Sequence, residues 1–294
     1  MTEQVNPNSQ NLDQLTPLEF VDLFNQEDAR VVDAVAQARQ AIADAITQTA
    51  AALHRGGRLF YVGAGTSGRL GVLDAAECPP TFCTPPELVQ GILAGGADAL
   101  VRSSEGLEDR AEDGATAIAE ASIGPDDVVV GITAGGTTPY VHGALEAARS
   151  RQATTVFIAC VPQSQVPMVA NVDIRLLVGP ELLAGSTRLK AGTVTKLVLN
   201  MISTGVMVQL GKVYGNRMVD VAVTNQKLYD RALGMLRDLT DLDKDAAAAL
   251  LEQSHSRVKL ALLMHWGHQS ADEGDRLLAA HNGDLRQALA AVAP

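Results

Sequence analysis

The sequence predicts an α/β protein built on a doubly wound, five-stranded parallel sheet. Short runs of β-branched and other apolar residues alternate with longer stretches of helical periodicity, which is the pattern of α/β folds. The runs are almost continuously apolar, as in Val128 to Ile132, and strands of this kind are covered by helices on both faces. The five expected strands are residues 58–62, 89–93, 127–132, 154–159 and 173–178.

An N-terminal helical arm is expected before the first strand. Apolar residues recur with helical spacing from Pro17 to Arg55, and an Ala-rich helix begins near Asp28 and runs almost to Gly56. We place the arm at residues 1–48 and the sheet domain at residues 49–215.

Helical regions are also expected after the sheet. Residues 189–213 read as one long, largely apolar helix, which has to be buried on several sides, for example at a subunit interface. From Asp243 onward, glycines separate short helical segments that resemble a small three-helix unit. We assign residues 216–294 to a C-terminal helical region and find no catalytic constellation in it.

Composition and charge exclude several classes of partner. The net charge of −11 leaves no basic stripe for a nucleic-acid backbone. The N-terminus is polar, and no run of about 18 apolar residues predicts a membrane span, so we expect a soluble, cytoplasmic protein. Cys78, Cys83 and Cys160 match neither a zinc pattern nor a disulfide framework. No metal site is expected.

A glycine-rich loop after the first strand predicts a phosphate site. Residues 63–69 open a helix, so backbone N–H groups and the helix dipole converge on one anion-sized space. We expect Gly65, Thr66, Ser67 and Arg69 to bind the phosphate, because two hydroxyls suit the oxygens of a monophosphate.

The same loop spells the G-x-G-x-x-G pattern of dinucleotide sites. A dinucleotide site needs a long first helix, however, and Pro79 and Pro80 are expected to end this helix early. We therefore favour a monophosphate over a dinucleotide.

Two further segments are expected to complete the site. Residues 133–139 follow the third strand and carry the hydroxyls of Thr133, Thr137 and Thr138, so they face the crevice at the carboxyl ends of the strands. Residues 185–192 add hydroxyl and basic side chains, namely Ser186, Thr187, Arg188 and Lys190. In an acidic protein this segment is the best candidate for local positive charge, although a solvated basic helix face would look the same.

Two carboxylates are candidates for acid and base chemistry. Glu77 is expected at the end of the first sheet helix, because Cys78 precedes Pro79, and there the dipole and partial burial favour a protonated acid. Glu108 is expected at the start of the next helix, where the dipole favours an ionised base. Such opposed environments let one site run both kinds of chemistry. Glu108 also has acidic neighbours, however, and acids in a first helical turn are ordinary capping residues.

Taken together, these segments resemble the N-acetylmuramic acid 6-phosphate etherase family over nearly the whole chain. The resemblance rests on residues 63–82, 105–109 and 185–192, with Asn6 to Leu12 and Lys212 to Asn216 in addition. It implies a sugar isomerase (SIS) fold in a cytoplasmic homodimer without a cofactor. The implied substrate is a small phosphosugar, N-acetylmuramic acid 6-phosphate. Its C3 lactyl ether is cleaved to N-acetylglucosamine 6-phosphate and D-lactate during cell-wall recycling.

The resemblance also implies roles for individual residues. Glu77 matches the family's proton donor, and Glu108 matches the second catalytic glutamate, which acts as the base. One segment departs from the family pattern: the usual Ala-Ser-Gly-Arg-Thr-Pro is Ala134 to Pro139 here, without the serine and the arginine. Arg69, Arg188 or Lys190 would then carry more of the positive charge. Two alternatives on the same fold remain, a phosphosugar-sensing regulator and an aldose-ketose isomerase.

Overall fold

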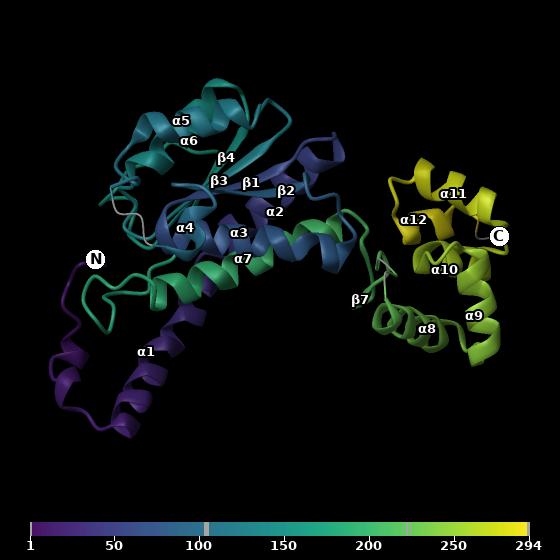
Figure 1. Ribbon diagram of the computed structural model, residues 1–294, viewed down its shortest axis with the longest axis horizontal. Coiled ribbons are helices and arrows are strands. Elements are labelled where there is room, and N and C mark those ends of the chain that lie inside the picture. Colours follow the sequence, from purple (N-terminus) through teal and green to yellow (C-terminus); the bar gives the residue numbers. More distant parts are fainter. Residues whose placement is uncertain (1, 103–105, 222, 224, 293–294) are drawn as a thin grey trace. The chain divides into compact units, whose positions relative to one another are not determined.

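The computed structural model describes residues 2–102, 106–221, 223 and 225–292 (Figure 1). The chain forms two compact units. The first comprises Met1–Ala76 and Pro86–Thr204, and the second comprises Glu77–Pro85 and Gly205–Pro294.

The first unit contains the predicted five-stranded parallel sheet, in the order β2-β1-β3-β4-β5. Its strands are β1 (Leu59–Gly63), β2 (Val89–Leu93), β3 (Val128–Thr133), β4 (Thr154–Ala159) and β5 (Val172–Arg175). Gly63 pairs in register with Leu93 on one side and with Ile132 on the other, so the loops after these strands begin at the same edge. The predicted fold class is confirmed, with β5 shorter than expected.

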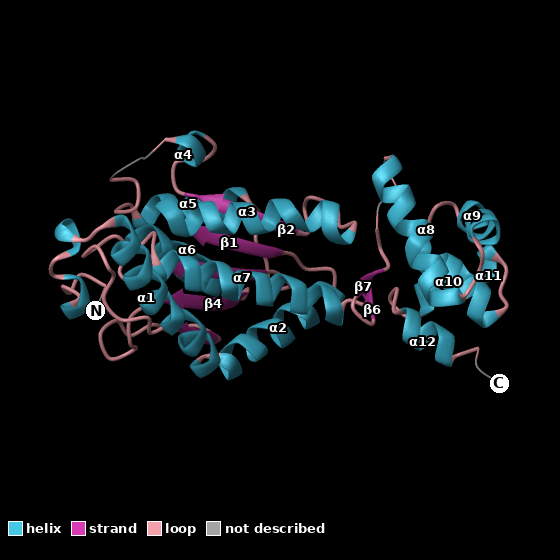
Figure 2. Cartoon of the chain, turned by 90° about the horizontal axis from the view of Figure 1, so that it is seen from below, coloured by secondary structure: helices cyan, strands magenta, loops and turns pink. Residues whose placement is uncertain are grey.

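Helices cover both faces of this sheet (Figure 2). On one face lie α5 (Ala111–Glu120) and α6 (Pro139–Ser150), which share a buried core with the sheet that includes Ile118, Val141 and Leu145. The other face carries α2 (Arg39–His54), α3 (Gly65–Phe82) and α7 (Lys190–Gln209). A short α4 (Asp98–Val101) follows β2.

The N-terminal arm is helical from Pro17 onward, as the apolar spacing predicted. Two short 3₁₀ helices, η1 (Pro7–Ser9) and η2 (Leu12–Gln14), precede α1 (Pro17–Gln37). Thr16 and Glu19 form a capping box that sets the start of α1, with Pro17 in the first turn. The expected start near Asp28 was therefore wrong, and Ala38 divides the expected single helix into α1 and α2.

The helix after β1 continues through its two prolines. Pro79 and Pro80 lie inside α3, which is 18 residues long. Their missing N–H groups remove only two helical hydrogen bonds near the C-terminal end, and the helix still closes with Cys83 N–H donating to the Pro79 carbonyl at 3.0 Å. The expected early end was wrong, so the monophosphate interpretation now depends on the hydroxyl-rich loop alone.

The apolar helix α7 is shorter than expected, because its predicted end forms a small hairpin of β6 (Val213–Tyr214) and β7 (Arg217–Met218). Among the described residues, α7 is also the one helix long and apolar enough to cross a membrane, and about half of its apolar stretch is buried inside the protein. Val194, Val198 and Ile202 are fully buried. The core helix of a soluble protein has the same length and composition, so this is weak evidence for a membrane span.

The second unit is a helical bundle built around α10 (Val258–Gly267), whose residues 258–263 are all buried. Its other helices are α8 (Gln226–Thr240), α9 (Lys244–Gln253), α11 (Ala271–Ala280) and α12 (Leu285–Ala290). Between Asp243 and residue 292, the last that the structure describes, there are thus four helices instead of the expected three. Gly274 lies inside α11 and does not interrupt it. Its lack of a side chain lets Leu260 approach closely, since an added Cβ would lie 2.7 Å from Leu260 Cδ1.

Candidate active site

A cavity of about 290 Å³ lies at the carboxyl ends of β1 and β3. Three chain segments contribute to its lining, as predicted: the glycine-rich loop, the loop after β3 and the start of α7. The lining residues are Glu3, Ala64, Gly65, Thr66, Ser67, Glu108, Thr133, Ala134, Gly135, Thr138, Thr187, Ala191 and Gly192. The loops after β1 and β3 therefore do face one crevice.

The structure explains why each of the three positions in the G-x-G-x-x-G loop is a glycine. A Cβ on Gly63 would lie 2.7 Å from the backbone nitrogen of Gly68, and a Cβ on Gly68 would collide with the Gly63 carbonyl. Gly65 has φ +53°, a left-handed conformation that favours glycine. The loop is thus folded tightly upon itself and exposes its backbone at the start of α3.

Hydroxyl groups give the cavity its polar surface. The hydroxyl oxygens of Thr133 and Thr138 lie 2.8 Å apart, and Thr133 Oγ1 also accepts a 3.2 Å hydrogen bond from Gly136 N–H. These contacts hold the loop after β3 in place. Thr66, Ser67 and Thr187 add three further hydroxyls from the other two segments, and hydroxyls can donate hydrogen bonds to phosphate oxygens.

The lining contains no Lys, Arg or His among the residues that the structure describes. The N-terminus of α3 supplies positive potential instead. The first N–H groups of α3 have no intrahelical acceptor, so the partial positive end of this helix points to the cavity. The N-terminus of α6 adds no free amide, because it begins with Pro139 and the N–H groups of Tyr140 and Val141 donate to the carbonyls of Glu108 and Thr138.

The basic residues predicted for this site do not line the cavity. Arg69 donates to the carbonyls of Ala99 at 2.8 Å and Arg102 at 3.1 Å, and so caps α4. Lys190 is fully buried, with its Nζ 2.6 Å from Glu27 Oε2. Arg188 is exposed and does not line the cavity.

Of the other predicted binding residues, Thr137 and Ser186 also lie outside the cavity lining. Gly65, Thr66, Ser67, Thr133, Thr138 and Thr187 are the predicted binding residues that the structure brings together. The site therefore consists of hydroxyls and the N-terminus of α3, without the expected basic groups.

An internal carboxylate occupies the N-terminus of α7. The Glu181 carboxylate accepts hydrogen bonds from the N–H groups of Lys190 and Ala191, each at 2.9 Å. Burial raises the pKa of Glu181, although these two bonds partly offset the effect. Because the amides of Lys190 and Ala191 donate to Glu181, these two N–H groups are not available to a phosphate.

Glu108 lines the cavity, as expected of a catalytic group, but not from a helix. It lies in a turn three residues before α5 begins at Ala111, so the predicted position in the first helical turn was wrong. Its carbonyl accepts a 2.9 Å hydrogen bond from Tyr140 N–H, which ties the turn to the start of α6. Glu105, the first residue of this predicted motif, lies outside the described residues.

Glu77 does not line the cavity. It is exposed in the interior of α3, twelve residues after Gly65, which corresponds to about 18 Å of helix rise. The predicted place at a helix end, with its dipole argument, was therefore wrong.

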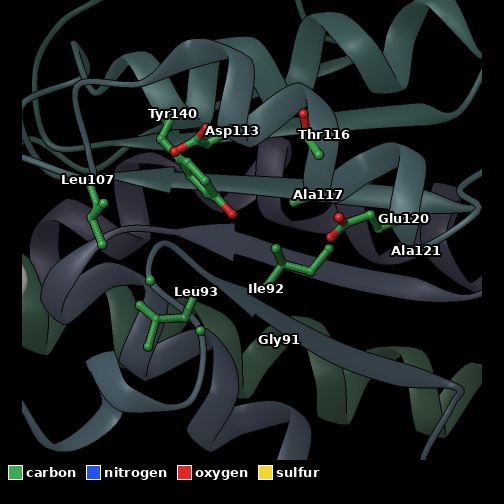
Figure 3. Close-up of a pocket in the computed structure, with 12 residues that line it drawn as sticks. Gly91, Ile92, Leu93, Leu107, Asp113, Thr116, Ala117, Glu120, Ala121 and Tyr140 are labelled. Atoms are coloured by element: carbon green, nitrogen blue, oxygen red, sulfur yellow. The ribbon is translucent and has the colours of Figure 1, made fainter.

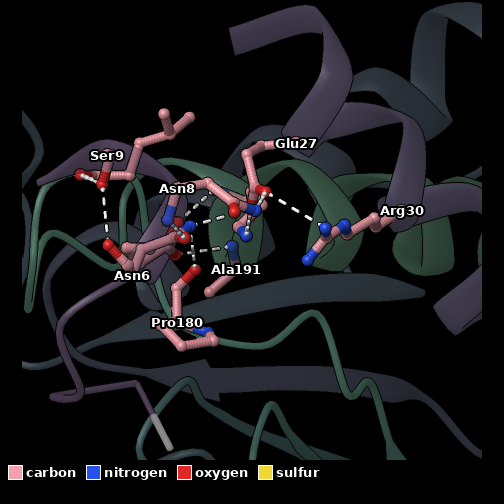
Figure 4. Close-up of polar contacts among 10 residues, drawn as sticks. Asn6, Asn8, Ser9, Glu27, Arg30, Pro180 and Ala191 are labelled. Carbon is pink, nitrogen blue, oxygen red and sulfur yellow. Dashed lines mark hydrogen bonds and ion pairs between the residues drawn. The ribbon is translucent and has the colours of Figure 1, made fainter. Parts of the chain in front are cut away.

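Sequence reasoning missed Glu3, whose carboxylate joins Glu108 in the lining. The segment that carries Glu3 is fixed by a polar network (Figure 4). Asn6 Nδ2 donates to Glu27 Oε2 at 2.8 Å and to the Pro180 carbonyl at 3.3 Å, and Ser9 Oγ donates to the Leu182 carbonyl at 2.6 Å. The signal for this anchoring was the family-like stretch from Asn6 to Leu12.

Glu27 is the centre of that network. Burial alone would raise its pKa, but hydrogen bonds from Lys190, Asn8 and Asn6 outweigh burial and lower the pKa to about 2. The buried pair of Glu27 and Lys190 thus joins the N-terminal segment to the start of α7. Among the described residues, no group of three or more His, Cys, Asp or Glu is placed to hold a metal ion.

The fold and the site define an SIS-type phosphosugar-binding protein. The family model for the glucokinase regulatory protein N-terminal SIS domain matches residues 41–149, and the model for the C-terminal lid domain of that protein matches residues 215–281. A phosphoheptose isomerase from Francisella tularensis aligns with a TM-score of 0.52 at 18% identity, over 66% of this chain and 100% of its own. This likeness confirms the fold.

The chain belongs to the N-acetylmuramic acid 6-phosphate etherase family. A curated protein of that name from Picosynechococcus sp. is 72% identical over 289 residues, which are 98% of this chain and 96% of that protein. The protein of the same name from Nostoc sp. is 72% identical over 99% of this chain and 94% of its own length. The family predicted from the sequence is confirmed.

Proposed function

We propose that this protein cleaves the C3 D-lactyl ether of N-acetylmuramic acid 6-phosphate, giving N-acetylglucosamine 6-phosphate and D-lactate in cell-wall amino sugar recycling. The observation that carries the proposal is the full-length 72% identity to curated etherases. The cavity adds chemical support, because it combines a phosphate-sized cradle with the carboxylate of Glu108.

The reaction is an elimination followed by addition of water. In the open-chain sugar, the C1 aldehyde acidifies the proton on C2. Glu108 removes that proton, and the C3–O bond breaks as a C2–C3 double bond forms. Water then adds to C3 while C2 is reprotonated. Each step transfers only protons and one leaving group, so no cofactor is required.

The phosphate anchors the substrate during these steps. The N–H groups at the start of α3 and the hydroxyls of Thr66, Ser67, Thr133 and Thr138 bind its oxygens. Glu77 enters the proposal through the family pattern alone, as the acid that protonates the departing lactate oxygen.

The proposal is tested by incubating the protein with N-acetylmuramic acid 6-phosphate and measuring both products. An etherase releases D-lactate and N-acetylglucosamine 6-phosphate in equal amounts. An aldose-ketose isomerase would instead give a ketose of unchanged mass, and a phosphosugar sensor would bind the compound without converting it.

The altered loop after β3 yields a prediction about phosphate affinity. Gly135 has room for a side chain, since an added Cβ would meet its nearest atoms at 3.9 Å, and Thr137 is exposed. We expect the double variant Gly135→Ser, Thr137→Arg to bind the phosphosugar about 10-fold or more tightly, because charge-assisted hydrogen bonds to phosphate are strong. Isothermal titration of product phosphosugar measures this.

Unphosphorylated N-acetylglucosamine is the control ligand for that titration, and its affinity should change little. Equal or weaker phosphosugar binding by the double variant would mean that the N-terminus of α3 and the hydroxyls already complete the cradle.

The proposal includes a homodimer in the cytoplasm. The arm helix α1 exposes Leu18, Val21 and Val32, and α7 exposes Met201 and Val208. Apolar surface of this kind is typical of subunit contacts. Light scattering at low micromolar concentration should give about twice the chain mass of 30.8 kDa. A stable, active monomer would contradict this part of the proposal.

A further inference from the structure

A second cavity, of about 510 Å³, lies between the edge strand β2 and helix α5 (Figure 3). Its floor is formed by Gly91, Ile92 and Leu93 of β2, and Leu107 and Tyr140 close one end. None of its lining residues belongs to the phosphate cavity. It is larger than that cavity and has a different chemistry.

One face of α5 makes the polar wall of this cavity. Asp113, Thr116, Ala117 and Glu120 line it, at the i, i+3, i+4 and i+7 spacing of a single helix face. The two carboxylates are therefore separated by about 10 Å along the helix axis. Thr116 lies between them, with its hydroxyl proton donated to the Glu112 carbonyl at 2.8 Å, so its remaining lone pairs can accept a hydrogen bond.

The cavity is negatively charged. No Lys, Arg or His contributes to its lining among the described residues. Arg110 Nη1 approaches Asp113 Oδ2 at 3.7 Å, but both side chains of this pair are about half exposed, so the pair is weak. The site therefore disfavours phosphosugars and other anions.

Tyr140 supplies a second, independent sign of a ligand. The residue is only 4% exposed, and its hydroxyl points into the cavity (Figure 3). Among the residues that the structure describes, that hydroxyl has no hydrogen-bond partner, and it is accessible from the cavity, so it can bond to a ligand there. Burial raises the pKa of Tyr140, and the charges of Asp113 and Glu120 raise it further, so the hydroxyl remains protonated.

We propose that this cavity binds a linear organic diammonium, such as a short polyamine. One ammonium group binds Asp113, the other binds Glu120, and the methylene chain lies along Ile92, Leu93 and Ala117. The hydroxyls of Tyr140 and Thr116 accept the remaining N–H groups. A single ammonium would satisfy only one end of the site, and a neutral diol would form no ion pair with either carboxylate.

The ligand would be coupled to the phosphate cavity through two residues. Tyr140, whose hydroxyl faces the ligand, donates its backbone N–H to the Glu108 carbonyl at 2.9 Å. Leu107, which also lines the cavity, precedes Glu108 in the chain. A bound diammonium is therefore expected to change the rate of lactate release at least twofold. This coupling rests on the proposed function, but the binding itself does not.

Isothermal titration with 1,6-diaminohexane tests the binding. The titration uses 0.15 M salt, because a chain with a net charge of −11 attracts cations non-specifically when ions do not screen it. We expect one site per chain and an affinity about 10-fold above that of hexylamine, the gain from one extra charge-assisted contact. 1,6-Hexanediol should give no measurable heat of binding.

Two variants and one matched control locate the site. Glu120→Gln should weaken diamine binding about 10-fold, and Tyr140→Phe should weaken it several-fold while preserving core packing. Glu112→Gln removes the same charge from a position on the same helix that does not line the cavity, and it should bind like the parent protein. Thermal melts verify folding of each variant.

The proposal is overturned if the parent protein shows no saturable diamine binding, if hexylamine binds equally well, or if Glu112→Gln weakens binding as much as Glu120→Gln. Saturable binding without any change in lactate release would contradict the proposed coupling but would support the binding site. An inactive protein that binds the diamine would count against the proposed activity alone.

Discussion

Replacing Glu108 with glutamine is expected to lower the rate of D-lactate release by about 100-fold or more, the usual cost of removing a positioned acid or base. The amide cannot accept the C2 proton. Glu108 is exposed in a turn, and its carbonyl contact with Tyr140 involves only the backbone, so the variant should fold normally. Steady-state kinetics of lactate release, with circular dichroism as the folding check, measure the effect.

Exchange of the C2 proton with solvent deuterium separates the roles of the two glutamates. Glu108→Gln should nearly abolish exchange, whereas Glu77→Gln should slow lactate release and leave exchange largely intact. Glu112→Gln, an exposed change on α5, is the control and should be near normal in both assays. Near-normal turnover by Glu108→Gln would remove Glu108 from the mechanism.

Replacing Glu27 with glutamine is expected to destabilise the first unit by about 3 kcal/mol or more, because the buried ammonium of Lys190 loses the carboxylate that pairs with it directly. Lys190 is fully buried and Glu27 is 2% exposed. Scanning calorimetry at pH 7 measures the loss. Asp22→Asn, an exposed change on the same helix α1, is the control and should change stability little.

The pH dependence of stability provides an additional test of the same pair. The folded-state pKa of Glu27 is about 2, below the ordinary value of 4.5. Its contribution is therefore fully present above about pH 4.5 and is lost as the pH falls towards 2. The parent protein should lose more stability over this range than Glu27→Gln. Equal acid sensitivity, or a loss no larger than that of Asp22→Asn, would contradict a stabilising role for the pair.

Features with local causes were predictable from the sequence. The five strands follow from apolar runs such as Val128 to Ile132, and the cradle follows from glycines whose neighbours leave no space for a side chain. Thr133 and Thr138 were placed correctly because the carboxyl ends of parallel strands meet at one edge.

Features that depend on distant partners were not predictable in this way. Lys190 looked like a phosphate ligand, but its partner Glu27 is 163 residues away, and no local pattern identifies that pair. Arg69 is similarly bound by carbonyls that lie 30 residues or more along the chain. Glu3 reaches the cavity only because the Asn6 and Ser9 contacts fix its segment.

Local rules were also too strict in two places. The residue before proline is biased away from helical geometry, but α3 continues through Pro79 and Pro80, since so few hydrogen bonds near its end are lost. Acidic residues near a predicted helix start suggested that Glu108 belongs to the helix. The turn before α5 holds it through the backbone instead.

The central claim is tested most directly by running the reaction in water enriched in oxygen-18 and weighing both products by mass spectrometry. Elimination and hydration break the bond between C3 and the ether oxygen, so the lactate keeps its original oxygen and the heavy oxygen appears at C3 of N-acetylglucosamine 6-phosphate. Heavy oxygen in the lactate, or no lactate at all from the folded protein, would contradict the account.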